Sequence, residues 1–461
     1  DARKRSYPPT VTNESMPSIT SRRRFLAAFG AAAGSSLAGC VDSVDELDGG
    51  VGDGRKSRSD FRAHQNSESS GDGAPVPEDA TTDWPYPRFD AQGTAYNPNP
   101  VGPTAKPSVR WSVEGGWPTG RVAVVGDTAY VPTADALLAL DTASGDERWR
   151  VGPREDTPEN YGSPRFTSPA VVTHEADDGS GDGQGESART VYVGTADRRG
   201  LLALDAATGD ERWRWNLGAS TSDVRAPPVP TYDADGIAVG TDEGLVAVLD
   251  PETGAERWRF EVYGAVSALA HSFTTLTVGT TGGEVYTLYD GRGFWRRKVG
   301  GAVESLVADE SGDVYVGTFG GGAYRLAGGL HAGRTRWRAA DAASIRLALA
   351  DGVVVGGNGA RATGLRSRTG DRRWRVEGSF EAPPAASGSV GYLAGDDVVA
   401  VNLDGGVGLG DARFGAVRWR VPVDGYVESG VTVADGALFF ATKGGESERG
   451  EDAEPRVYAV E

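Results

Sequence analysis

The chain has 461 residues, of which 67 are glycine, and its formal net charge is −18. Only five of its 47 basic residues are lysine, a composition typical of salt-adapted prokaryotes, so we expect a haloarchaeal protein. The acid excess disfavours nucleic-acid binding, which requires clustered lysine and arginine. The single cysteine, Cys40, excludes an intrachain disulfide and a metal site built from several cysteines.

The first recognisable segment, "SRRRFL" (21–26), precedes an alanine- and glycine-rich apolar run. That run has about a dozen residues, whereas a bilayer span needs roughly 20. The segment resembles a twin-arginine export signal, with Arg22, Arg23, Phe25 and Leu26 as its defining residues. "LAGC" (37–40) resembles a lipobox, which implies cleavage before Cys40, lipidation of its thiol, and anchoring to the outer face of the cytoplasmic membrane. The alternative is an ordinary buried cysteine.

Two further features divide the N-terminal region. Met16 is the only methionine and lies just before the export signal, so we expect translation to start there. Residues 41–83 are rich in Asp, Gly, Ser and Glu and poor in aromatic residues, which predicts a disordered tether. The predicted organisation is therefore an extension plus signal peptide (1–40), a tether (41–83) and one folded domain (84–461).

The folded domain is built from an internal repeat. Tryptophans that follow an arginine or another bulky residue recur every 37–45 residues, with one longer gap of 64. That gap contains an acidic, glycine-rich insert (176–189), without which the period is restored. The repeated residues are Trp111, Trp149, Trp213, Trp258, Trp295, Trp337, Trp374 and Trp419.

Each repeat predicts a four-stranded antiparallel meander. In the clearest unit, three short apolar runs (168–174, 190–195 and 201–205) precede the strand that carries Trp213. The runs are rich in β-branched and aromatic residues and are bounded by Gly and Asp turns. No segment beyond residue 84 shows sustained helical periodicity.

Counting the second strand of every unit gives eight blades. The last unit, ending in "VYAVE" (457–461), lacks a tryptophan strand, whereas the first tryptophan strand, "VRWSV" (109–113), has no preceding strands of its own. The two halves complete one blade, so we predict an all-β, eight-bladed propeller closed by pairing of the N-terminal strand with the C-terminal blade. Such closure removes exposed sheet edges.

A small residue, a glycine and a tryptophan recur at relative positions 1, 7 and 11, as in Ala139, Gly145 and Trp149. The pattern resembles the tryptophan-docking motif of the PQQ-like (pyrroloquinoline-quinone repeat) β-propeller superfamily, which implies that each indole packs on a glycine turn between blades. The implied docking glycines are Gly145, Gly209, Gly254, Gly333 and Gly370. The same alignment assigns Ala327 to the first position of the unit that contains Trp337. Strand boundaries stay open in two degenerate units (285–297 and 382–420).

Two functional classes share these repeats. One is the non-catalytic propellers, such as the lipoprotein subunit of the outer-membrane β-barrel assembly machinery; the other is the quinoprotein dehydrogenases, which use PQQ and Ca²⁺. The lead-in "DWPYPRFDAQGTAYNP" (83–98) resembles that of quinoproteins, but it also suits a strap that covers one end of the propeller. The chain has no second cysteine to pair above a cofactor, and no set of Glu, Asn and Asp residues matches the quinoprotein pattern.

We therefore expect a membrane-tethered, monomeric, cell-surface scaffold that binds an unknown protein partner, without catalytic residue, metal or cofactor. A PQQ- and Ca²⁺-dependent dehydrogenase is the first alternative. The second is a carbohydrate- or polymer-binding module that uses exposed aromatic residues such as Trp84, Trp117 and Tyr161. The acidic insert resembles a Ca²⁺ loop but has Arg189 where the bidentate glutamate is needed, and the four histidines lack metal-ligand spacing.

Overall fold

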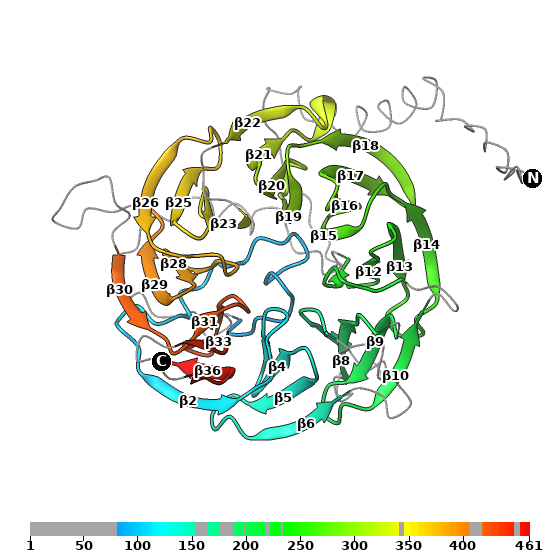
Figure 1. The fold of residues 1–461 in the computed structure, drawn as a ribbon. Helices are drawn as coiled ribbons and strands as arrows, with labels where there is room; N and C mark the ends of the chain where they lie inside the picture. Colours follow the sequence, from blue (N-terminus) through cyan, green and yellow to red (C-terminus); the bar gives the residue numbers. More distant parts are fainter. Residues whose placement is uncertain are drawn as a thin grey trace, which may run out of the picture. The chain divides into compact units, whose positions relative to one another are not determined.

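The computed structural model describes residues 81–152, 165–174, 188–197, 199–216, 222–231, 234–340, 345–404, 417–446 and 452–461. They form eight four-stranded antiparallel sheets arranged as the blades of a closed ring (Figure 1). The first strand of each blade lies towards the ring axis and the fourth forms the rim. The predicted eight-bladed β-propeller is thereby confirmed.

The first seven blades each use four strands that follow one another in the chain. Blades 1 and 2 contain β3 (Ala123–Val125), β4 (Thr128–Pro132), β5 (Leu137–Asp141), β6 (Glu147–Val151), β7 (Ala170–His174), β8 (Ala188–Gly194), β9 (Leu201–Asp205) and β10 (Glu211–Trp215). Blades 3 and 4 contain β11 (Val229–Pro230), β12 (Ile237–Gly240), β13 (Leu245–Leu249), β14 (Glu256–Glu261), β15 (Val266–Ser272), β16 (Thr275–Thr280), β17 (Glu284–Tyr289) and β18 (Arg292–Lys298).

The later blades follow the same order. Blades 5 and 6 contain β19 (Ala302–Ala308), β20 (Val314–Phe319), β21 (Gly322–Leu326), β22 (Thr335–Ala339), β23 (Arg346–Ala350), β24 (Val353–Gly357), β25 (Arg361–Arg366) and β26 (Arg372–Glu377). Blade 7 contains β27 (Ala385–Ser387), β28 (Val390–Ala394), β29 (Asp397–Asn402) and β30 (Val417–Pro422). A 3₁₀ turn, Gly329–His331, is the one helical element among the described residues, and none of them forms a helix able to cross a membrane.

Blade 8 joins the two ends of the domain, as predicted. Its inner strands β31 (Tyr426–Val427), β32 (Thr432–Ala434), β33 (Ala437–Lys443) and β36 (Arg456–Val460) come from the C-terminal region. The rim strand is β2 (Val109–Glu114), which pairs antiparallel with β36 and places Trp111 opposite Ala459. A two-stranded ribbon, β34 (Gly445–Glu446) and β35 (Asp452–Ala453), projects from the same blade.

The lead-in crosses the ring axis as a strap of residues 84–97, seen as the blue segment in the middle of Figure 1. Its backbone forms hydrogen bonds with the innermost strands of six blades. The bonds join Trp84 to Val124, Pro85 to Val171, Ala91 to His271, Gln92 to Ala308, Thr94 to Leu349 and Ala95 to Ala386. Its last residues form β1 (Tyr96–Asn97), which runs parallel to β27. The strap therefore closes one end of the axis.

Most neighbouring blades are joined by a rim tryptophan that packs on a glycine turn. A Cβ added to Gly209, whose φ is +78°, would lie 2.8 Å from Cε3 of Trp149 in the preceding blade. The Trp149 Nε1–H also donates to the carbonyl oxygen of Ala206 at 3.0 Å. The same contact joins Trp111 to Gly145, Trp213 to Gly254, Trp295 to Gly333 and Trp337 to Gly370. Only a residue without a side chain admits the ring at this distance.

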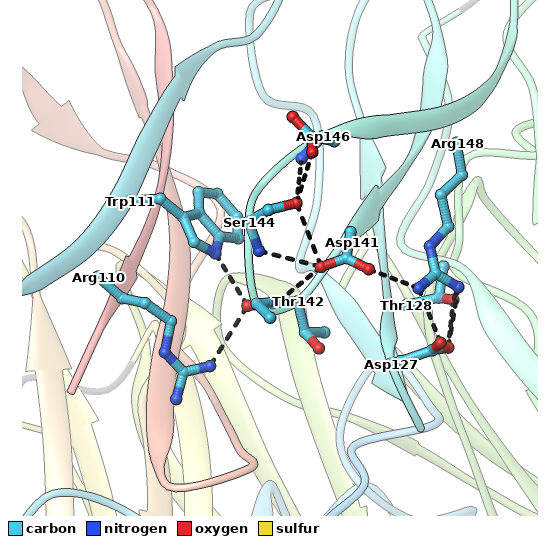
Figure 2. A network of polar contacts seen from close by, with 10 residues as sticks. Arg110, Trp111, Asp127, Thr128, Asp141, Thr142, Ser144, Asp146 and Arg148 are labelled. Atoms are coloured by element: carbon cyan, nitrogen blue, oxygen red, sulfur yellow. Dashed lines mark hydrogen bonds and ion pairs between the residues drawn. The ribbon is translucent and has the colours of Figure 1, made fainter.

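A repeated aspartate organises the same turn (Figure 2). Oδ1 of Asp141 accepts two backbone N–H groups of the turn at 2.9 Å, and its Oδ2 pairs with Arg148 at 2.6 Å. The carbonyl of Thr142 then accepts the Trp111 Nε1–H at 2.8 Å. Asp205 repeats this arrangement in blade 2. The aspartate thus shapes the turn on which the tryptophan of the neighbouring blade docks.

The degenerate units depart from the predicted spacing in two ways. Between β17 and β18 a shorter turn places Gly291, absent from the predicted set, against Trp258. In blade 5, Trp337 lies opposite Arg325 rather than beside Ala327, because the 3₁₀ turn lengthens the connection. In every unit with this contact, the turn glycine lies four residues before the tryptophan of its own blade.

One boundary differs from the sequence expectation, and one that was left open is now partly described. The acidic insert was placed at 176–189, but Ala188 and Arg189 belong to β8 and pair with His174 and Thr173. The rest of the insert lies outside the described residues. In the degenerate seventh unit, β29 and β30 are described, and the connection 405–416 between them lies outside the described residues.

Candidate functional site

The two ends of the ring axis are built differently. In blades 4 to 6 the strap forms hydrogen bonds near the last residues of the innermost strands. A cavity lies at the other end of the axis, where it is lined by residues near the start of the same strands, Ser267, Glu304 and Arg346. We call these the strap end and the mouth end. Because antiparallel strands alternate in direction, the mouth end also carries the loops between blades and the turns between second and third strands.

The axial cavity at the mouth end has a volume of about 410 Å³. Most blades contribute a residue from the start of the innermost strand or from the loop before it, and the strap forms its floor. Five arginines and three carboxylates line it: Arg88, Arg121, Arg165, Arg225, Arg346, Asp90, Glu304 and Glu428. Arg165 and Arg225 are exposed, so the cavity is within reach of solvent. Positive side chains thus gather at the centre of an acidic protein.

Arg121 is the most deeply buried of these arginines, with 3 % of its surface exposed. Its guanidinium lies over the Trp84 ring at 5.2 Å and donates to the carbonyls of Val431, Pro383 and Pro384 at 2.7–2.9 Å. The Nε–H, however, has no hydrogen-bond partner among the described residues. Burial, with the neighbouring charges of two further arginines, lowers the pKa of Arg121 well below its usual value.

Those neighbours are Arg88 of the strap and Arg346 of β23. Arg88 donates to Gly93 O at 2.8 Å and to Leu347 O, and burial lowers its pKa to about 10 despite the nearby Asp90. Among the described residues, Arg346 makes one hydrogen bond, a long one of 3.5 Å to a backbone carbonyl. Within the described parts of the chain, no carboxylate lies within ion-pair distance of Arg88, Arg121 or Arg346. The three guanidinium groups repel one another.

The carboxylates of the cavity do not gather as cation ligands do. Asp90 is turned to Thr94, whose backbone N–H donates to it at 2.9 Å, and burial raises its pKa to about 6. Glu428 lies 3.6 Å from Lys443 and Glu304 stands on another blade. Across the described ranges no three His, Cys, Asp or Glu side chains form a group that could hold a metal ion. The cavity suits the carboxylates of PQQ better than its Ca²⁺.

The mouth end also exposes large aromatic side chains from separate loops and turns. Trp117, between β2 and β3, is 49 % exposed, and Tyr263, between β14 and β15, is 73 % exposed. Phe319, at the turn from β20 to β21, is 64 % exposed. A groove of about 630 Å³ runs beside Trp117 and is lined in part by Leu138 and Arg150. Exposed aromatic residues of this size are typical of recognition surfaces.

The residues singled out in the sequence fall into three groups. The docking tryptophans and glycines lie between blades, away from the axial cavity. The export and lipidation residues Arg22, Arg23, Phe25, Leu26 and Cys40 lie outside the described residues, as does Tyr161. The expectation that Trp84 is exposed is wrong: it is 0 % exposed because Phe89 and Arg121 cover its ring. Trp117 is exposed as expected.

Sequence reasoning missed the arginines of the axial cavity. Arg88, Arg121 and Arg346 are far apart in the chain and belong to no common motif. The usable signal was positional: Arg121 and Arg346 each stand at or just before an innermost strand, and neither is part of the repeated "RW" pattern. Departures from a repeat mark the positions where a repeat protein carries its specific chemistry.

The fold resembles solved structures of both functional classes. BamB from Moraxella catarrhalis is 18 % identical, with 77 % of this chain and 98 % of that chain covered and a TM-score of 0.55. Quinohemoprotein alcohol dehydrogenase from Comamonas testosteroni is 16 % identical (82 % and 80 % covered, TM-score 0.58). The related ADHIIG from Pseudomonas putida HK5 is 14 % identical (83 % and 80 % covered, TM-score 0.61). At these identities the likeness shows the fold alone.

Comparison of the sequence with known families identifies the family. No curated protein matches the chain. The family model described as "Outer membrane protein assembly factor BamB" matches residues 103–271 and 242–383, which together exceed half of the chain. The chain therefore belongs to the BamB-type family of PQQ-repeat β-propellers.

Proposed function

We propose that this propeller is a non-catalytic scaffold that binds a protein partner through its mouth end. The observation that supports the proposal most is the exposure of Trp117, Tyr263 and Phe319 in three separate loops or turns of that one end. Exposing such large rings to water is unfavourable, and aromatic side chains of this kind become anchors when a partner covers them. The description of the family as an assembly factor agrees with a binding role.

The position of the scaffold in the cell forms a second part of the proposal. The twin-arginine pattern and the lipobox would export the chain and attach it through Cys40 to the outer face of the cytoplasmic membrane. The acidic segment 41–83 would then act as a tether that holds the propeller off the membrane. Replacement of Cys40 by serine should release the protein into the medium; retention of this variant on the membrane contradicts the anchor.

Site-specific photocrosslinking tests the binding surface. A photoreactive amino acid placed at Tyr263 or Phe319 in the producing cells should give the same covalent adduct, identified by mass spectrometry. Leu330 provides the matched control, since it is 82 % exposed but lies in the turn between β21 and β22, at the strap end. An adduct that forms equally well at Leu330, or different adducts at the two mouth positions, contradicts a specific surface there.

Quinoprotein chemistry is tested separately. The cavity offers arginines for the carboxylates of PQQ but no gathered carboxylate group for Ca²⁺ among the described residues. A scaffold should not reduce an electron-acceptor dye with alcohols or sugars when PQQ and Ca²⁺ are supplied. Sustained dye reduction that depends on both would refute the non-catalytic proposal.

A further inference from the structure

The axial cavity holds positive charge that the protein itself leaves unbalanced. The whole chain carries a formal charge of −18, and its surface arginines are extensively paired with carboxylates, as Arg148 is with Asp127 and Asp141. In the cavity the pattern is reversed, since Arg88, Arg121 and Arg346 have no ion-pair partner within the described residues. Burying unpaired charges is costly, so proteins normally pair them or use them to bind a charged ligand.

The hydrogen bonding of Arg121 points in the same direction. Its two terminal nitrogens are satisfied by carbonyls of blades 7 and 8, which explains its place between these blades. Its Nε–H is buried without a partner among the described residues, and Arg121 is one of the residues that line the cavity. A buried N–H without a hydrogen-bond partner destabilises the folded state, so such a donor calls for an explanation.

We propose that the axial cavity binds a small multivalent oxyanion, either a phosphate or a di- or tricarboxylate, through Arg88, Arg121 and Arg346. Guanidinium groups donate charge-assisted hydrogen bonds to carboxylate and phosphate oxygens, which makes arginine suited to such ligands. The cavity volume of about 410 Å³ falls within the range of small-molecule sites. The proposal is independent of partner binding at the rim.

The arrangement also explains why the ligand should carry more than one negative charge. Arg225 is already paired with Asp223 and Asp242, Glu304 partly offsets Arg346, and Asp90 partly offsets Arg88. The net excess at the centre therefore comes from Arg121 and from the charges of Arg88 and Arg346 that these carboxylates offset only in part. A monovalent anion would leave part of this repulsion in place, whereas a divalent or trivalent anion removes most of it.

Calorimetric titration of the purified protein tests the site. Sodium phosphate and sodium citrate serve as probes at constant ionic strength, with sodium chloride as the reference. Arg346→Gln is the informative variant, because Arg346 makes one long hydrogen bond within the described part of the chain and its loss should spare the fold. Arg121→Gln is less suitable, since Arg121 also holds carbonyls of two blades.

We expect saturable binding of at least one probe, weakened by about 10- to 100-fold in Arg346→Gln, as expected for loss of a charged hydrogen-bonding group. Arg334→Gln removes the same charge from an exposed position at the strap end and should leave the affinity unchanged. Tighter binding of citrate identifies a polycarboxylate ligand, and tighter binding of phosphate identifies a phosphate group. Absence of saturable binding by both probes, or equal weakening by the two variants, overturns the proposal.

Discussion

Adding one methyl group to a docking glycine should weaken the whole ring. In Gly209→Ala the new Cβ would lie 2.8 Å from the Trp149 ring, at a backbone φ of +78°. A side chain in this left-handed conformation costs roughly 1–2 kcal/mol. Displacing a packed indole adds about 1–3 kcal/mol, as overpacking does elsewhere. The free energy of unfolding should therefore fall by about 2–5 kcal/mol.

Gly436→Ala isolates the contribution of the indole. Gly436 has a similar φ of +72°, but no atom lies within 4 Å of the position that its Cβ would take. This variant should lose only the conformational part, roughly 1–2 kcal/mol, and any stabilisation from a stiffer unfolded chain is common to both variants. Equilibrium denaturation in urea measures the difference. Equal losses in the two variants would refute the conclusion that the Trp149 ring occupies the space beside Gly209.

Three further perturbations follow from the same contacts. Trp111→Ala removes the indole that joins the closing strand to Gly145, so the free energy of unfolding should fall by about 3–5 kcal/mol in urea denaturation; a loss below 1 kcal/mol contradicts a role in closure. Trp374→Phe loses a hydrogen bond to a carbonyl at 3.0 Å, whereas Trp419→Phe loses none among the described residues. The first should therefore cost about 0.5–1.5 kcal/mol more, and an equal cost would count against that bond. The hydrogen bond from an arginine and those from the turn N–H groups lower the pKa of Asp141 to about 2. The ionised Asp141 side chain therefore stabilises the fold fully above the unfolded pKa near 3.8, and this stabilisation is lost as the pH falls towards 2. Asp141→Asn should flatten this part of the pH–stability profile, and an unchanged profile would contradict the assignment.

The fold was predictable because each blade repeats the same local sequence pattern. Strand length, turn residues and the glycine–tryptophan separation can all be read within one unit, and neighbouring units contact each other in the same way. Failures occurred where a unit departs from the pattern. Gly291 was missed because its turn is shortened, and Ala327 was assigned wrongly because a 3₁₀ turn lengthens its unit.

The candidate site was less predictable. Trp84 was taken as an exposed aromatic residue near a loop, yet the strap places it against Phe89 and Arg121. Exposure of Trp117 was expected, whereas its location at the same end as Tyr263 and Phe319 follows only from strand direction. A rim surface of this kind depends on which end of each blade a loop occupies.

By itself, the sequence determined the blade count, the antiparallel meander, the closure of the ring and the tryptophan–glycine contacts. These properties depend on contacts within a blade or between adjacent blades, and every copy of the repeat contains the residues that make such contacts. Only the tertiary structure decided that the strap crosses the axis and that Arg88, Arg121 and Arg346 meet there. The physical reason is that a closed ring brings the starts of all its innermost strands to one axis, so residues hundreds of positions apart become neighbours without any shared local pattern.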